Sequence, residues 1–354
     1  MPLANLGSAA PPKSNTITTA TIINSGAPKF ISHNLPSGTN RVSSGRAISH
    51  IPALSARQRF YLSYPGGVVL EAVVNISEGR DPLALDAMAR ACGPWLIDIH
   101  TDIDHNRSVF TLADIDPQQV LQATQALADA AASKIDLRNH EGVHPKFGAI
   151  DVVPFIPLDD TTHLEAEQIA WKFANWLAEE HRVPIFFYDN ADPNKRSLPQ
   201  IRREAFTDRV PDIGPSQSNP RLGACAVGIR EPLVAVNFLL DSINSEAAQK
   251  IARVIRESNG GLPGVRALAF HLDSQQCSQV SLNITDLTKT STEQAYEQVE
   301  ELAREHGVRI NHIELVGLVP QAELEKWRPE FQKRCGITQT QTIEARIAKT
   351  HKRG

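Results

Sequence analysis

The sequence predicts an α/β protein of the α+β class, in which one order of strands and helices occurs twice. From residue 68 onward, apolar runs of strand length alternate with longer segments that have helical periodicity. The same order of elements returns after residue 233, although the residues themselves do not repeat. We therefore expect two similar sandwiches of helices on a sheet and not a solenoid.

The first pass is defined by its strand runs and by two Asp-Pro pairs that open helices. Asp81 precedes Pro82 and Asp116 precedes Pro117, which is typical of a capped helix start. In chain order we expect a strand at 68–74, a helix at 81–92, strands at 94–100 and 107–113, a helix at 116–135 and a strand at 149–158. Pro154 predicts that the last strand lies near an edge or a bend. The order βαββαβ is ferredoxin-like.

The second pass has the same βαββαβ order and follows a connecting region. Its expected elements are a strand at 233–240, a helix at 245–260, strands at 265–272 and 277–284, a helix at 291–307 and a strand at 308–320. The connecting region is expected to hold a helix at 161–182, a short strand at 184–188 and a long irregular stretch at 189–222. A loop of that length in a compact chain is usually functional. The predicted organisation is an extension at 1–67, subdomains at 68–230 and 231–330, and a polar tail at 331–354.

The composition is that of a soluble globular protein large enough for two domains, with 354 residues, 41% hydrophobic and 21% charged. The net charge of −4 argues against a protein that binds nucleic acid through bulk electrostatics. No apolar run approaches the roughly 18 residues of a membrane helix, so no membrane partner is expected. The four cysteines are far apart and form no CxxC pair, which indicates a reduced, cytoplasmic protein.

The amino-terminal segment differs from the rest of the chain. Residues 1–70 contain six Lys or Arg and no Asp or Glu, so the remaining residues carry a net charge of −10. Such a segment buries too little apolar surface to offset its ordering entropy, and we expect disorder. Its composition also resembles an organelle transit peptide. A natural tail, or a start codon assigned too far upstream, is the alternative, because no clean amphipathic helix is present.

The stretch from His140 to Pro157 joins a polar loop with two histidines to a continuous apolar strand. Folds often present catalytic side chains on such a loop. The segment His140 to His144 also fits the H-E-x-x-H pattern of zinc proteases, which requires a helix. Gly142 lies between the histidines and Pro145 follows them, and both residues disfavour a helix. We therefore interpret the segment as a loop.

Histidines and acids concentrate in two segments, His100 to Arg107 and His140 to Lys146. Histidine suits proton transfer at neutral pH because its ordinary pKa is about 6.5. His144 precedes a proline, which restricts its backbone, so it is a candidate acid–base group, with a structural role as the alternative. A metal site built from His100, His105, His140 and His144 is conceivable, but nothing in the spacing demands one.

A third segment, Gly214 to Gly223, has small polar residues and two prolines that could close over a planar ligand. A plain surface connection is the alternative. Basic residues in or near these loops favour an anionic small molecule over a polymer, or else are ordinary surface charges; they are Arg107, Lys146, Arg202, Arg221 and Arg230.

Nine stretches together resemble the formiminotransferase domain family. They are VVNISEGRD at 73–81, NRSVFTLAD at 106–114, HEGVHPKFGAIDVVPFIP at 140–157, FFYDNA at 186–191, RSLPQIRREAF at 196–206, DIGPSQSNPRLGACAVGIR at 212–230, LVAVNF at 233–238, SQVSLNITD at 278–286 and LVGLVP at 315–320. They occur in family order across roughly residues 70–328. No single motif is decisive, but nine in register make chance an insufficient explanation.

The resemblance implies two similar α/β subdomains with a tunnel between them, and a transfer of a formimino group from N-formimino-L-glutamate to N5 of tetrahydrofolate. Tetrahydrofolate is then a co-substrate, no metal is expected, and the activity belongs to one-carbon metabolism and histidine degradation. The catalytic histidine of the family corresponds to His144. The folate-binding loop corresponds to Gly214, Pro215, Ser216, Gln217, Ser218, Asn219, Pro220, Arg221, Leu222 and Gly223. Asn75, Ser77, Asn106 and Arg107 match motifs that face the tunnel, and His100 and Lys146 complete the expected substrate site. Relatives form dimers, so a homodimer is possible.

The sequence departs from the family pattern at three positions. The family usually has an aspartate where His100 stands and an arginine where Lys146 stands. The loop that holds Asn75 lacks the proline of relatives and has Val74 instead. The first change removes an anion near the acid–base group, and the second removes a bidentate fork. The alternative function is therefore a folate-binding relative with another one-carbon donor or with no turnover.

Overall fold

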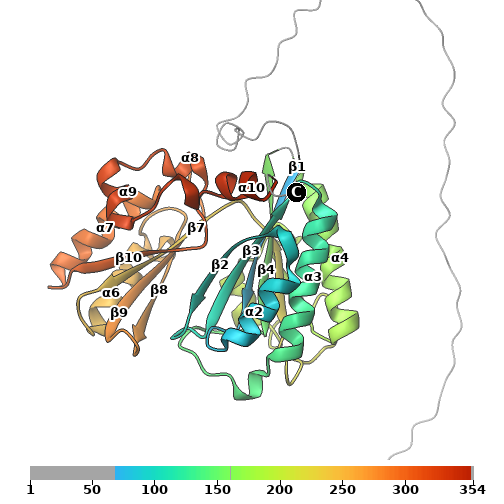
Figure 1. The fold of residues 1–354 in the computed structure, drawn as a ribbon. Helices are drawn as coiled ribbons and strands as arrows, with labels where there is room; N and C mark the ends of the chain where they lie inside the picture. Colours follow the sequence, from blue (N-terminus) through green and yellow to red (C-terminus); the bar gives the residue numbers. More distant parts are fainter. Residues whose placement is uncertain (1–67, 160, 352–354) are drawn as a thin grey trace, which may run out of the picture. The chain divides into compact units, whose positions relative to one another are not determined.

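The computed structural model describes residues 68–159 and 161–351, so the predicted extension at 1–67 lies outside the described residues. The described part contains a six-stranded sheet of order β2-β3-β1-β4-β6-β5 and a four-stranded sheet of order β10-β7-β9-β8 (Figure 1). The predicted α+β class with two subdomains is confirmed.

The first sheet begins with the predicted βαββαβ unit. Its elements are β1 (Val68–Ile76), α2 (Pro82–Ala91), β2 (Leu96–Asp102), β3 (Arg107–Asp114), α3 (Pro117–Lys134) and β4 (Ile150–Asp159). β1 pairs antiparallel with β3 and β4, and β3 pairs antiparallel with β2, which gives the ferredoxin-like order β2-β3-β1-β4. The sheet then continues through α4 (His163–His181), β5 (Ile185–Asp189), α5 (Leu198–Glu204) and β6 (Cys225–Ile229).

Two elements of this region differ from the prediction. The stretch 189–222, predicted to be irregular, contains the helix α5, and β6 is a strand that was not predicted. β6 lies between β4 and β5 and is parallel to both. It therefore attaches β5 to the ferredoxin-like unit and brings the end of the long loop back into the sheet.

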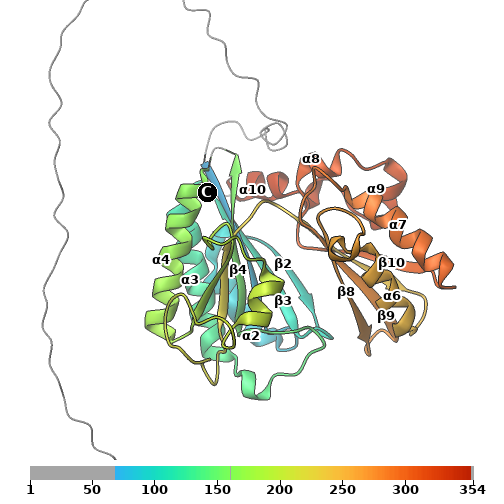
Figure 2. The ribbon, with the colours of Figure 1, turned by 180° about the vertical axis from the view of Figure 1, so that it is seen from behind.

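Local capping explains where the long helices begin. Asp81 accepts hydrogen bonds from two backbone N–H groups of α2, and Asp116 accepts one from α3. Thr162 forms a capping box with Glu165 at the start of α4. α2, α3 and α4 cover one face of the sheet and bury a large apolar core against it (Figure 1). α5 packs on the other face (Figure 2). There, Ile201 is buried in an apolar cluster with residues of β4, β5 and β6.

Pro154 lies inside the sheet, so of its two predicted places the edge is wrong, whereas the bend agrees with an irregular stretch of the pairing between β1 and β4. β4 lies between β1 and β6, and its pairing with β1 passes from Ala72–Phe155 to Asn75–Val152 without the two intervening pairs. Proline has no N–H to donate to the facing Val73 carbonyl, which instead accepts from Asn75 Nδ2 at 3.0 Å. A local side-chain donor thus replaces the missing strand hydrogen bond.

A register shift follows immediately in the same pair of strands. Asn75 pairs with Val152 and Ile76 pairs with Ile150, so Asp151 is the additional residue of a β-bulge. Bulges re-aim side chains, and this one turns a single carboxylate out of an otherwise apolar strand. The site described below is organised around that carboxylate.

The second sheet is a βαββαβ unit with the same strand order. Its elements are β7 (Val234–Leu240), α6 (Ser245–Ile255), β8 (Val265–Leu272), β9 (Cys277–Ile284), α7 (Thr292–Glu305) and β10 (Ile310–Val316). α6 ends five residues before the predicted glycine end, because Gly260 closes a separate 3-10 turn at Glu257–Asn259. Ser291 caps α7 in a capping box with Gln294.

The carboxyl-terminal segment, expected to be a polar tail, is helical and packed. After α8 (Gln321–Leu324) come α9 (Pro329–Cys335) and α10 (Ile343–His351). Phe331 belongs to the core of the second sheet, whereas Ile343 and Ile347 pack with residues of the first sheet. Within residues 68–159 and 161–351, none of the helices is long and apolar enough to cross a membrane.

Candidate functional site

The segment from His140 to Lys146 is a loop, as predicted, and not a helix. Gly142 is required by a close approach: a Cβ there would lie 2.4 Å from the His105 carbonyl oxygen. The histidines at 140 and 144 therefore do not share a helical face, and the zinc-protease geometry is absent from this loop. In the part of the chain that the structure describes, no group of three or more His, Cys, Asp and Glu side chains is placed to hold a metal ion.

Asn106, predicted to face the substrate, holds this loop in place. It has a left-handed backbone with φ of 47°, its Oδ1 accepts from Gly79 N at 2.9 Å, and its Nδ2 donates to the Glu141 carbonyl at 2.9 Å. His140 Nε2 lies 3.0 Å from the Asn106 carbonyl, and Lys146 Nζ donates to the His140 carbonyl at 2.8 Å. Both polar groups of the Asn106 side chain are thus hydrogen-bonded to the backbone of this protein.

The ring of His144 is held by the carbonyl of the next residue. His144 Nδ1 lies 2.7 Å from the Pro145 oxygen. A carbonyl oxygen only accepts hydrogen bonds, so Nδ1 carries the proton and the lone pair is on Nε2. Burial, together with the positive charge of Arg107, lowers the pKa of His144 to about 3. The group is therefore a neutral imidazole at physiological pH, and its Nε2 carries the lone pair.

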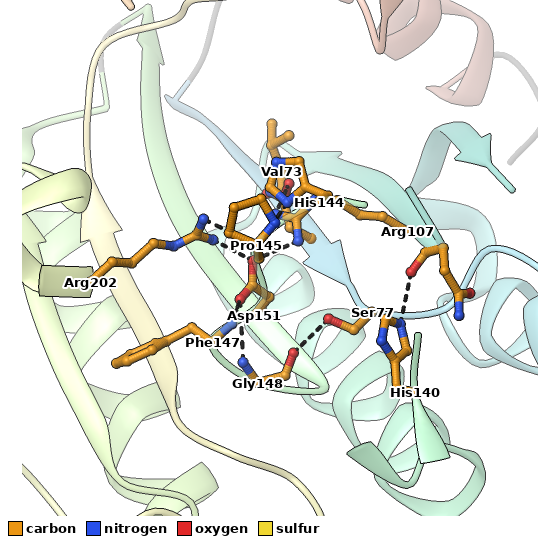
Figure 3. Close-up of polar contacts among 12 residues, drawn as sticks. Val73, Ser77, Arg107, His140, His144, Pro145, Phe147, Gly148, Asp151 and Arg202 are labelled. Atoms are coloured by element: carbon orange, nitrogen blue, oxygen red, sulfur yellow. Dashed lines mark hydrogen bonds and ion pairs between the residues drawn. The ribbon is translucent and has the colours of Figure 1, made fainter. Parts of the chain in front are cut away.

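Two arginines converge on Asp151 beside this histidine (Figure 3). Arg107 Nη1 and Arg202 Nη2 each donate to Asp151 Oδ2 at 2.6 Å, and Arg107 Nη2 donates to Asn75 Oδ1 at 2.8 Å. The Asp151 side chain is completely buried. Burial alone would raise its pKa, but the two guanidinium groups outweigh burial and hold the pKa at about 2. The cluster keeps one excess positive charge next to His144.

Arg202 also links this cluster to the histidine. Its Nη1 donates to the Pro145 carbonyl at 3.3 Å, the same oxygen that receives His144 Nδ1 (Figure 3). The amide groups of Phe147 and Gly148 donate to the other oxygen of Asp151. The carboxylate is therefore bonded on both oxygens.

Asp151 is not among the predicted site residues, although its place in the sequence carries a signal. It is the only charged residue in the apolar run from Phe147 to Leu158. A lone acid in a buried strand requires a cationic partner, because an unpaired buried charge is costly. The two basic residues that supply it, Arg107 and Arg202, were predicted to favour an anionic small molecule or to be ordinary surface charges, and not to pair with Asp151.

One aromatic side chain of the second sheet, Phe270, packs against two histidines of the first. The Phe270 ring of β8 lies 5.7 Å from the His144 ring, with 29° between the planes, and 4.6 Å from the His105 ring. His105 and His144 are themselves 5.6 Å apart. In the β2–β3 turn, Asp104 accepts hydrogen bonds from Ser274 N at 3.1 Å and from the Ser274 hydroxyl. Phe270 thus contacts the loop His140–Lys146, and Phe270 and Ser274 together contact the β2–β3 turn.

His100, the predicted departure from the family pattern, faces a carboxylate of the second sheet. Its Nε2 lies 3.7 Å from Glu314 Oε1 of β10, and Glu314 Oε2 accepts from Asn237 Nδ2 at 2.9 Å. An acid therefore lies next to position 100 even though position 100 itself is a histidine. The sequence alone gave no indication of this pairing, because the two residues are 214 positions apart.

One buried amide on the second sheet has no bonded partner. Gln279 of β9 pairs in register with Phe270 on one side and Leu239 on the other, so it lies between two apolar side chains. It is fully buried, and neither Oε1 nor Nε2 has a hydrogen bond in the described part of the chain. Such a group lowers stability relative to an apolar residue of the same shape.

The predicted folate-binding loop lies along the ends of α3 and α4. Asn219 Nδ2 donates to the carbonyls of His181 at 3.1 Å and Arg182 at 3.3 Å. The Arg221 guanidinium donates to the Ala132 carbonyl of α3. These two side chains are committed to helix ends, whereas Gly214, Ser216, Gln217, Ser218 and Pro220 are exposed.

Backbone contacts connect this loop to the histidine loop. Gly223 forms a bridge with Gly148, and a Cβ at Gly148 would lie 1.9 Å from the Ala224 oxygen. Ser77 joins the same place, because its hydroxyl donates to the Gly148 carbonyl at 2.7 Å. Across residues 68–159 and 161–351, no hydrogen bond or ion pair joins a side chain of 214–223 directly to His144. The structure thus places Asn75, Arg107 and His144 in one cluster and the exposed loop beside it.

Comparisons with known proteins match both sheets. The N-terminal subdomain of the formiminotransferase domain matches residues 69–230, and the formiminotransferase domain matches residues 235–347. Glutamate formimidoyltransferase of Streptococcus pyogenes serotype M1 is 35% identical over 271 residues, which are 72% of this chain and 90% of that protein. Glutamate formimidoyltransferase of Thermoplasma acidophilum is 35% identical over 298 residues, 79% of this chain and 98% of that protein. Formimidoyltransferase-cyclodeaminase of Rattus norvegicus is 35% identical over 273 residues, which are 71% of this chain and 50% of that protein.

Proposed function

Because this chain belongs to the formiminotransferase domain family, we propose that it transfers the formimino group of N-formimino-L-glutamate to N5 of tetrahydrofolate. The observation that carries the proposal is the neutral His144 ring, whose Nδ1 is bonded to a carbonyl and whose Nε2 carries the lone pair. Such a nitrogen suits the removal of a proton from an attacking amine.

The reaction needs one group, His144, that accepts a proton in the first step and returns it in the second. As N5 attacks the formimino carbon, its proton passes to Nε2 of His144, and the ring becomes an imidazolium. The tetrahedral intermediate then collapses, the bond between carbon and the glutamate nitrogen breaks, and the same proton passes to that nitrogen. The products are N5-formimino-tetrahydrofolate and glutamate. Acid–base help of this kind is worth about 10²–10⁴-fold in rate.

The surrounding charges suit an anionic donor substrate. Arg107 and Arg202 share one carboxylate, so the cluster has one excess positive charge beside His144. A substrate carboxylate near these guanidinium groups would offset their charge and raise the pKa of the histidine, which strengthens Nε2 as the proton acceptor in the first step. The exposed part of the loop Gly214–Gly223 is the proposed folate-binding segment.

The test is a steady-state assay of the purified full chain with N-formimino-L-glutamate and tetrahydrofolate, read after acid conversion of the product to its methenyl form. His144→Ala should lower kcat by at least two decades. His163→Ala, which removes an exposed histidine at the start of α4, is the matched control and should keep full activity.

Absence of wild-type turnover while tetrahydrofolate still binds in calorimetry would reject the donor, and a different one-carbon donor or a non-catalytic folate binder would then be favoured. His100 and Lys146 are the positions that motivate that second candidate, because the family usually has an aspartate and an arginine there.

We also propose a cytoplasmic location, supported by four free cysteines in the described part of the chain, three of which are buried. A thiol titration of the native and the unfolded protein, isolated without reductant, would test it. Fewer than four thiols in the unfolded protein would contradict it.

A further inference from the structure

The histidine at the proposed acid–base centre is oriented by a backbone carbonyl and not by a carboxylate. His144 Nδ1 lies 2.7 Å from the Pro145 oxygen. That carbonyl belongs to an exposed loop residue, so the loop itself offers it little restraint. A histidine base requires a partner on its second nitrogen that fixes both the tautomer and the ring direction.

Arg202 is the side chain that restrains this carbonyl. Its Nη1 donates to the Pro145 oxygen at 3.3 Å, while its Nη2 donates to Asp151 Oδ2 at 2.6 Å. One planar guanidinium thus joins the carbonyl of an exposed loop residue to a carboxylate with no exposed surface. The geometry requires a fork, because a single point charge cannot reach both acceptors in fixed directions.

The helix that carries Arg202 is itself well anchored. Ile201, the preceding residue, is completely buried in an apolar cluster with Phe186, Tyr188 and Val152. α5 therefore ties the guanidinium to the strands β4 and β5, which are parts of the rigid sheet. The charged groups around His144 are Arg107 of β3, Asp151 of β4, Arg202 of α5 and His105 of the β2–β3 turn.

We propose that Arg202 is a positioning residue that holds the Pro145 carbonyl, and through it keeps the proton of His144 on Nδ1 and the lone pair of Nε2 directed at the substrate. The inference rests on the proposed role of His144 as the acid–base group. During the reaction Nδ1 keeps its proton throughout, and only Nε2 gains and loses one. The carbonyl is a sound partner for both states, because it accepts from the imidazole and from the imidazolium alike.

The first experiment measures the tautomer directly, in the protein without substrate. ¹⁵N chemical shifts of His144 should show the Nδ1–H tautomer in the wild type. Arg202→Ala should give a mixture of both tautomers, because the carbonyl is released. Arg203→Ala is the matched control, since Arg203 is the exposed neighbour on the same helix, and it should leave the tautomer unchanged. If Arg202→Ala keeps the pure Nδ1–H tautomer, the proposal is wrong.

The second experiment separates positioning from substrate binding. Arg202→Ala should lower kcat by up to about 100-fold with a smaller change in KM, since a misdirected base slows the chemical step. Arg202→Lys, which can bond one of the two acceptors, should recover part of the loss. A rise in KM with unchanged kcat would overturn the proposal in favour of a binding role.

The two proposals fail in different ways. Without wild-type turnover, the proposed function fails, while the tautomer of the substrate-free protein still tests the role of Arg202. A circular dichroism melt confirms that each variant is folded. If Arg202→Ala does not fold, Arg202→Lys serves in its place, because it keeps a positive charge beside Asp151.

Discussion

Replacing Asp151 with asparagine should lower the free energy of unfolding more than a conservative change at the surface does. The carboxylate is completely buried, and it faces two guanidinium groups whose side chains are 11% and 21% exposed, those of Arg107 and Arg202. Asparagine keeps an oxygen for the amide groups of Phe147 and Gly148. Its Nδ2 group is a donor, so it cannot accept the two hydrogen bonds that Oδ2 receives from the guanidinium groups. The change therefore removes the charge and both of these hydrogen bonds, and two largely buried cations lack their counter-ion.

Two independent routes give a similar magnitude. Removing one partner of a buried ion pair costs about 3–5 kcal/mol. The pKa of Asp151 falls from an ordinary 3.8 to about 2, which corresponds to about 2–3 kcal/mol in favour of the charged form. Because Arg202 is partly exposed and retains access to water, we expect about 3 kcal/mol.

The assay is urea unfolding at about pH 7 and at lower pH. Because the folded-state pKa is depressed, the stabilisation is present above about pH 4 and is lost as the pH falls toward 2. The difference between wild type and Asp151→Asn should therefore shrink below about pH 4. Asp86→Asn, which breaks an exposed pair with Arg90 on α2, is the control and should cost at most about 0.5 kcal/mol. A loss of less than about 1 kcal/mol for Asp151→Asn, or a difference that does not depend on pH, would refute the reasoning.

Three further predictions concern activity and stability. The lowered pKa of His144 means that the base is already neutral below pH 6, so the acidic limb of the pH profile of kcat/KM should lie well below the ordinary histidine value of about 6.5; a limb near 6.5 would contradict it. Gly142→Ala should lower kcat, because its Cβ would lie 2.4 Å from the His105 oxygen and displace the loop; an unchanged kcat and unchanged amide spectra of the loop would show that the loop adapts. Gln279→Met should leave the free energy of unfolding unchanged or raise it by about 1 kcal/mol, because neither end of the amide is bonded; a loss above about 1 kcal/mol in thermal or urea unfolding would reveal a hidden partner.

The order of elements could be predicted because its signals are local. Three helices are capped by the residue that precedes them, which is Asp81, Asp116 or Ser291. The start of each helix can therefore be predicted from the adjacent sequence. β6 was missed because its five residues contain a glycine and are defined only by pairing with β4 and β5. Pro154 was misjudged because the residue that compensates for it, Asn75, lies on another strand.

The site could be predicted only in part, for the same reason. His144 was identifiable because a histidine, a proline and a following apolar strand are adjacent in the sequence. Phe270 and Glu314 were not, because they reach the first sheet from a separate unit more than a hundred residues later. The roles of Asn106 and Asn219 depend on which backbone carbonyls lie within hydrogen-bonding distance of their side chains, and no sequence pattern specifies those carbonyls.

The substitute hydrogen bond at Val73 has a consequence for folding fidelity. A one-residue slip between β1 and β4 would move Pro154 opposite a different carbonyl, which no asparagine amide could reach, and would also turn every side chain of the strand to the wrong face. That carbonyl would be buried without a donor, at a cost of about 1–3 kcal/mol. The proline and the asparagine therefore favour one register of β1 and β4, and that register is the one that forms the bulge at Asp151, between its two arginines.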